Sequence, residues 1–110
     1  MHITAVPFAT VDWQSVPEVA QPGETGVVYS RTREAGNIRV RMVRYSPHYL
    51  ADHWCSRGHV ILVLEGELIT ELADGTVHRL GPGMSYQVAT DATPHRSRTE
   101  AAGATLFIVD

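Results

Sequence analysis

The sequence is poor in cysteine and has no long apolar run, and both absences narrow its class. Cys55 is the only cysteine among 110 residues. The chain therefore cannot form an internal disulfide, which favours a reducing compartment. No apolar stretch approaches the ~20 residues that a membrane-spanning helix needs. Residues 1–10 lack the basic start and continuous apolar segment of a signal peptide. We expect a cytoplasmic protein with no membrane partner.

An excess of charge of one sign is lacking as well. Charged residues make up 19% of the chain, and the formal net charge is −3 with a pI near 6.0. This balance provides no positive field for a phosphate backbone, so nucleic acid is not an expected partner. Apolar residues amount to 44%, which indicates one soluble globular domain with a core and argues against disorder.

The sequence also lacks helical periodicity, because no stretch of about ten or more residues has apolar side chains at the spacing of an amphipathic helix. Residues 1–25 contain several proline and glycine breakers and are predicted to form an irregular N-terminal arm. Turn residues divide the rest into short runs, a pattern typical of a β-sandwich or barrel. The class predicted is all-β. The predicted strands are 26–32, 38–45, 50–56, 59–64, 67–72, 76–80, 84–88, 94–99 and 104–109.

Two of these runs have patterns that indicate how they are buried. In the run that begins at Ile38, apolar side chains up to Met42 alternate with Arg39 and Arg41, which is the pattern of a half-buried strand. Residues 59–64 are instead a dense run of β-branched residues and leucine, typical of a strand buried on both faces.

Three histidines and the cysteine form a candidate metal site. His53 and Cys55 are two apart, so on one strand their side chains leave by the same face. His59 follows across a predicted turn, where an antiparallel neighbour could bring it opposite that pair, and His95 joins them only in a closed fold. Three imidazoles and a thiolate make a complete tetrahedral set for a divalent, borderline-soft ion. Taken singly, each residue has an ordinary alternative, as a hydrogen-bonded core histidine, a small buried cysteine or a turn histidine.

The spacing resembles the first motif of the cupin family. The matching positions, with one, three and six residues between them, are His53, Cys55, His59 and Gly66. The family's second motif opens on a glycine and closes on a histidine, as Gly83 and His95 do here. The run Asp52-His53-Trp54-Cys55 is similar to that of small bacterial cupins named for a motif of Asp, His, Cys and Trp, the DHCW-motif cupin fold proteins. Here Trp and Cys stand in exchanged order.

The resemblance implies a single-domain cupin double-stranded β-helix, a jelly-roll barrel, over residues 26–110. It also implies that the metal ligands are His53, Cys55, His59 and His95, and that the protein is a homodimer. The apolar character of both faces of 61–64 agrees with a partner covering one of them.

The chain departs from the cupin motifs at several positions. Pro47 replaces the leading glycine, Cys55 the second histidine and His59 the glutamate, and Asp91 stands near the turn glycine of a second motif that is one residue longer. A metal-bound thiol is deprotonated. The set therefore still contains three imidazoles and one anion, but the anion is softer. We expect one divalent transition metal, with zinc favoured and iron, nickel or copper as alternatives. No binding residues for an organic cofactor are identified.

Four further side chains lie near the motifs. Tyr86 has a catalytic and a structural interpretation, and the other three have only a structural one. Tyr86 lies on the strand that lines cupin barrels, so the resemblance makes its hydroxyl a candidate catalytic group for a bound molecule or metal-bound water; the alternative is a core tyrosine. Trp54 is predicted to pack away from the ligands. Arg96 and Arg98 are predicted to face outward into solvent.

Two functions remain open at this point. The first is a metalloenzyme that acts on a small molecule in the barrel mouth, where a catalytic metal needs an open position. Either Cys55 detaches, or an all-histidine triad of His53, His59 and His95 holds iron. The second is a non-enzymatic metal- or redox-sensing module with a closed site of three histidines and the cysteine. Fold cannot choose between them.

Overall fold

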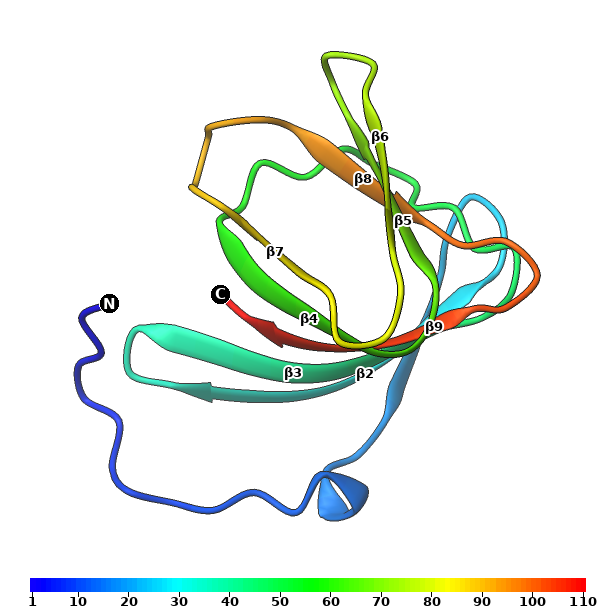
Figure 1. Cartoon of the computed structure of the whole chain (residues 1–110). Coiled ribbons are helices and arrows are strands. Elements are labelled where there is room, and N and C mark those ends of the chain that lie inside the picture. Colours follow the sequence, from blue (N-terminus) through cyan, green and yellow to red (C-terminus); the bar gives the residue numbers. More distant parts are fainter.

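Two antiparallel sheets enclose the interior of the molecule, as the computed structural model of residues 1–110 shows (Figure 1). The larger sheet has the order β1-β2-β3-β9-β4-β7, and the smaller has the order β6-β5-β8. The predicted all-β class is confirmed, and the chain contains no helix long and apolar enough to cross a membrane. The elements are the 3-10 helix η1 (Trp13–Ser15) and the strands β1 (Val19–Pro22), β2 (Val27–Ala35), β3 (Ile38–Tyr45), β4 (His59–Gly66), β5 (Leu68–Leu72), β6 (Val77–Leu80), β7 (Ser85–Val88), β8 (His95–Arg98) and β9 (Ala104–Val109).

Most predicted strands occur within a few residues of their expected bounds, but the strand predicted over 50–56 is wrong. This segment is a loop that touches the sheets only through isolated bridges, from Leu50 to its neighbours and from Cys55 to His95. A strand needs a continuous ladder of backbone bonds. Between Leu50 and Cys55, the side chains of Asp52 and His53 are exposed and bond to each other.

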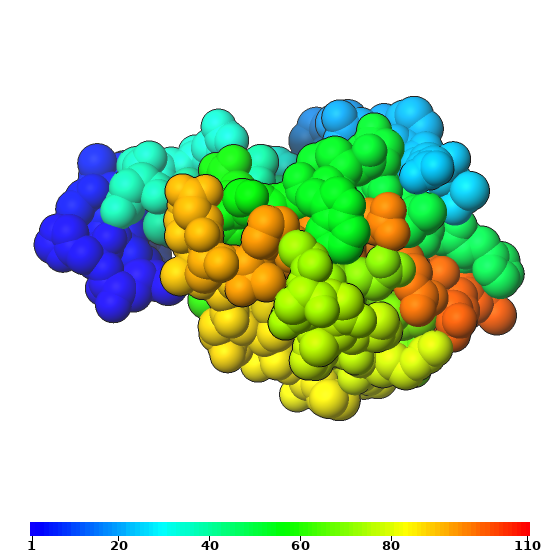
Figure 2. Space-filling view, turned by 90° about the horizontal axis from the view of Figure 1, so that it is seen from above, coloured from blue at the N-terminus to red at the C-terminus, as the bar shows by residue number.

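The N-terminal arm is irregular only in its first part. The predicted irregularity fails at β1, which pairs with β2 as the edge of the large sheet. Near its start, the arm is fastened to the β2–β3 turn, where Thr4 N donates to Asn37 Oδ1 (2.9 Å) and Asn37 Nδ2 donates to His2 O (2.8 Å). Figure 2 shows these first residues in dark blue, projecting from the body beside the cyan turn.

The two-faced pattern predicted for β3 is present, with the arginine side facing the interior. Arg39 and Arg41 line the central cavity together with Val43 and Tyr45. The register carries the row that contains Arg41 across the inner face of the large sheet. The members of that row are Arg41, Ile108, Ile61 and Tyr86.

The hydrophobic core lies one step further along the strands. The paired residues Val43, Leu106 and Val63 are at most 2% exposed, and full burial of such side chains contributes roughly 1.5–3 kcal/mol each. One end of the barrel is therefore closed by apolar packing, and the other presents charged and polar side chains. The core cluster consists of Val43, Ile61, Val63, Leu68, Leu80, Ala104, Leu106 and Ile108.

Strand β4 is buried on one face, so the prediction of burial on both faces is wrong for a single chain. Ile61 and Val63 lie in the core, whereas Val60, Leu62 and Leu64 are 36–40% exposed. They lie on the outside of the sheet, where Leu62 pairs with Phe107. We call Val60, Leu62, Leu64 and Phe107 the outer apolar face.

Candidate metal centre

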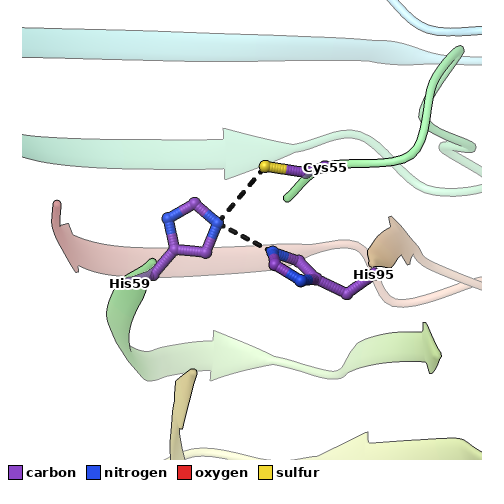
Figure 3. A group of neighbouring side chains, drawn as sticks. All are labelled: Cys55, His59 and His95. Carbon is purple, nitrogen blue, oxygen red and sulfur yellow. Dashed lines mark hydrogen bonds between the residues drawn. The ribbon is translucent and has the colours of Figure 1, made fainter. Parts of the chain in front are cut away.

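Three of the four predicted ligands converge at the polar end of the barrel. The donor atoms of Cys55, His59 and His95 all lie within 4.8 Å of one another (Figure 3). His59 begins β4 and His95 begins β8. Cys55 precedes β4 in the loop, and its backbone exchanges two hydrogen bonds with His95, of 2.8 and 2.9 Å. These backbone bonds attach Cys55 to strand β8 of the smaller sheet and hold its thiol beside the two histidines.

Each histidine uses Nδ1 for a bond to the protein. The ring of His59 has Nδ1 2.9 Å from Asp110 Oδ2, and the ring of His95 has Nδ1 2.9 Å from the carbonyl oxygen of Thr93. Both partners are acceptors, so each Nδ1 donates, and a neutral ring then has an unprotonated Nε2. These two Nε2 atoms face each other at 2.9 Å, which places two lone pairs in contact unless both bind one metal ion or one ring takes a second proton.

Burial favours the neutral form of His59. Its side chain is 7% exposed. Burial lowers the pKa of His59 below its ordinary value, outweighing the opposite effect of the hydrogen bond and charge of Asp110. Neutral imidazole is the form that binds metal ions.

The thiol of Cys55 completes a donor set that fits a soft divalent ion. Its Sγ lies 3.6 Å from His59 Nε2. A tetrahedral zinc ion, with bonds of ~2.3 Å to sulfur and ~2.0–2.1 Å to nitrogen, separates such atoms by roughly 3.5 Å. The backbone N–H of Arg57 also donates to Sγ (3.4 Å). Donor chemistry and spacing are thus consistent with a bound metal.

His53, the fourth predicted ligand, lies outside this group. Its side chain is 76% exposed, and its Nδ1 lies 2.6 Å from Asp52 Oδ1. It nevertheless lines the same cavity as the other three. The four-ligand set remains a prediction.

Asp110 is the residue that sequence reasoning missed. Its side chain is fully buried, and Arg39 binds its carboxylate through Nε (2.8 Å) and Nη2 (3.0 Å). Burial alone would raise the pKa of Asp110, but the bonds and charges of Arg39, Arg41 and His59 hold it well below its ordinary value. A signal was present in the sequence, because Asp110 has the same parity as the buried residues of β9.

Tyr86 packs as a core tyrosine, one of its two predicted interpretations, and its catalytic role stays a prediction. Its ring packs against the core and lies edge-on to the ring of His95, with centroids 6.1 Å apart. Its hydroxyl is buried and has no hydrogen-bond partner. Burial raises the pKa of Tyr86, so the hydroxyl stays protonated.

The two arginines of β8 are ion-paired, in place of the free solvation predicted for them. Arg96 Nη2 and Arg98 Nε donate to Glu71 at 2.9 and 2.7 Å. Arg96 also lies over the ring of Trp54, with its guanidinium carbon 4.8 Å from the centroid. Trp54 is 44% exposed and lines the same cavity as the three donors, so the prediction that it packs away from the ligands is wrong.

A cavity of about 520 Å³ opens beside the three donors. Its lining includes the donors, His53, Tyr86 and several apolar side chains. The charged residues of the lining are Arg39, Arg41, Arg57 and Arg96. A small molecule in this space contacts the donors directly, which is the arrangement of most small-molecule sites.

No family model matches the sequence, and no curated protein matches it. Solved structures do match. A sugar phosphate isomerase of the cupin superfamily from Silicibacter pomeroyi has 21% identity and a TM-score of 0.72, with 92% of this chain and 74% of that one covered. The polyketide cyclase RemF from Streptomyces resistomycificus has 23% identity and a TM-score of 0.73, with coverage of 94% and 78%. The Fe(II) form of HppE has 15% identity and a TM-score of 0.76, with coverage of 94% of this chain and 60% of HppE.

These similarities and the two facing sheets establish the class of the protein. The chain has the small cupin fold, an all-β jelly-roll barrel, as its motifs predicted. Within that fold, Cys55, His59 and His95 form a group that could hold a metal ion.

Proposed function

We propose that this cupin holds one divalent transition metal between His59, His95 and Cys55 and acts on a small molecule in the adjacent cavity. The observation that carries the proposal is the 2.9 Å approach of two Nε2 atoms whose rings both donate through Nδ1. Lone pairs at that distance repel, and a metal ion removes the repulsion. Zinc is the favoured metal because of the thiolate, with iron, nickel and copper as alternatives.

Three protein donors beside an open cavity favour catalysis, because a catalytic metal keeps at least one position for substrate or water. A metal in this place supplies Lewis acidity to an oxygen of the bound molecule. Asp110 orients the ring of His59 and keeps its Nδ1 protonated. Tyr86 lines the cavity beside the donors. The similar structures include an Fe(II) protein and a sugar phosphate isomerase, which agrees with metal-dependent small-molecule chemistry.

The second candidate function is a metal or redox sensor, in which His53 joins the three donors to close a four-ligand site. The thiol of Cys55 lines a cavity that is open to solvent, so oxidants reach it, and oxidation of a thiolate ligand releases metal. Coordination number separates the two functions. A four-coordinate ion without bound water supports the sensor, and an ion with a water ligand supports the enzyme.

Metal analysis of the purified protein tests the proposal. We expect about one zinc, iron, nickel or copper ion per chain, and loss of that metal in His59→Ala and His95→Ala. His78→Ala is the matched control, because His78 is an exposed histidine of β6 outside the group. Stoichiometric metal in both site variants, or none in wild-type protein supplied with zinc, contradicts the proposal.

We also propose that two copies of the chain pair through the outer apolar face. Leu62 and Phe107 are paired neighbours on adjacent strands, and with Val60 and Leu64 they place four apolar side chains on the outside of the large sheet. A second copy presents the same surface, which is the geometry of a two-fold interface. Light scattering that gives the mass of a monomer at all concentrations excludes this pairing.

A further inference from the structure

The cavity beside the donors has an unbalanced set of charges. Four arginines line it, and no aspartate or glutamate does. Arg96 is balanced from outside by Glu71. The other three guanidinium groups, of Arg39, Arg41 and Arg57, approach a single carboxylate, Asp110. The protein therefore leaves a net positive charge around this space.

The hydrogen bonds of Asp110 show which arginine is left with free donors. Arg39 binds the carboxylate through two nitrogens, and His59 takes a further position on Oδ2. Arg41 reaches the same oxygen through Nη2 alone (2.9 Å), and its Nε is buried without any partner. A guanidinium has five N–H donors, so most of those of Arg41 have no acceptor in the protein.

Two other side chains line the cavity near Arg41. Tyr86 contributes its ring, and its hydroxyl is buried. Arg57 is half-exposed at the cavity rim, and its Nε is 3.7 Å from Asp110 Oδ2, beyond hydrogen-bond distance. Beside Arg41, the apolar side chains of Val43, Ile61 and Ile108 also line the cavity and form its apolar floor.

We propose that this cavity binds the oxyanion group of a small acid, a carboxylate or a phosphate, with Arg41 as its main partner and Arg57 at the entrance. The proposal rests on the proposed function, since it identifies the substrate class of the same site. An oxyanion accepts from the free donors of Arg41. The apolar floor favours a short hydrocarbon part on the same molecule. The two anions share this chemistry, and the experiment distinguishes them.

Nuclear magnetic resonance titration of ¹⁵N-labelled protein, freed of metal with a chelator, tests the proposal. The probes are isobutyrate, its neutral amide isobutyramide, and inorganic phosphate. We expect isobutyrate, phosphate or both to shift the amide signals around Arg41 and Tyr86 with saturation, and isobutyramide to leave them in place. Arg41→Gln weakens the binding at least about tenfold, as expected for loss of a charged hydrogen bond.

Two further variants keep the test decisive. Arg44→Gln removes the same charge from the outer face of the same strand, where Arg44 lies over the ring of Tyr29, and leaves binding unchanged. Arg57→Gln alters an exposed side chain and weakens binding a few-fold without a risk to folding. Equal effects of Arg41→Gln and Arg44→Gln, or equal binding of acid and amide, overturn the proposal.

Metal dependence separates this proposal from the metal proposal. Anion binding that persists without metal supports the role of Arg41, even if the metal analysis shows no bound ion. Anion binding that occurs only with metal present overturns that role and leaves the metal centre intact.

Discussion

His59 and Asp110 are joined by a 2.9 Å bond between Nδ1 and Oδ2, although 51 residues separate them in the chain. The same carboxylate binds Arg39 and Arg41. One buried charge therefore orients a candidate metal ligand and anchors the arginines of the cavity. A carboxylate that accepts a hydrogen bond from the second ring nitrogen of a ligating histidine raises the basicity of that ligand and fixes the orientation of its ring.

Asp110→Asn tests this linkage. The change keeps the shape of the side chain and removes its charge, so we expect zinc affinity to fall about 10–100-fold. Competition with a chromophoric chelator measures the affinity. Glu71→Gln is the control, because it removes a carboxylate that pairs with two arginines away from the group. Equal losses in the two variants argue against a specific role for Asp110.

Cys55→Ser separates a ligand from a packing residue. We expect the fold to persist and the affinity for zinc to fall, since serine offers a harder and weakly acidic donor. In cobalt-substituted protein, the charge-transfer absorption of a thiolate ligand disappears. Unchanged zinc affinity together with an unchanged cobalt spectrum means that Cys55 only packs beside the metal.

His53→Ala tests the four-ligand set. Because His53 is exposed and bonded to Asp52, we expect it to lower zinc affinity less than His95→Ala does. Metal-to-protein ratios after dialysis against limiting chelator measure the difference. A complete loss of metal in His53→Ala supports a site in which the loop closes on the ion, as the sensor function requires.

Leu106→Ala and Leu62→Ala compare the core with the outer apolar face. Leu106 is fully buried, and Leu62 is 36% exposed. In a monomer we expect Leu106→Ala to lower the free energy of unfolding by about 2–5 kcal/mol, and Leu62→Ala to lower it by less than about 1.5 kcal/mol. Urea denaturation measures both. A loss for Leu62→Ala that grows with protein concentration indicates that a second copy covers this face.

Glu71 makes part of the stability depend on pH. The hydrogen bond and charge of Arg96, with those of Arg98, lower the pKa of Glu71 in the folded protein. This stabilisation is present above the pKa of the unfolded chain, roughly 4.3, and is lost as pH falls through the folded value. We therefore expect the Tm difference between wild type and Glu71→Gln to shrink on acidification. Glu65→Gln, without an ion pair, is the control, and a difference that is constant from pH 7 to pH 3 contradicts the interpretation.

The sequence by itself determined the strands, the cupin fold and three of the residues that come together. Alternation and turn residues are local signals, so β3 and β9 have their predicted bounds. The motif intervals identify Cys55 and His95 as neighbours of His59, although Cys55 lies in a loop and His95 begins a strand of the other sheet.

Tertiary structure alone decided which face of β3 lines the cavity and which residues lie beside the candidate metal ligands. Alternation is symmetric, so it cannot state which side of a strand faces inward. Here the arginines do, because Asp110, which is distant in sequence but directly follows the neighbouring strand β9, compensates them. The position of His53 likewise depended on whether residues 50–56 form a ladder, and a ladder requires a partner strand that local sequence does not specify. Charges and strands that are distant in sequence become neighbours only when the barrel closes. For this reason the shape and the charge of the candidate site could not be predicted from the sequence.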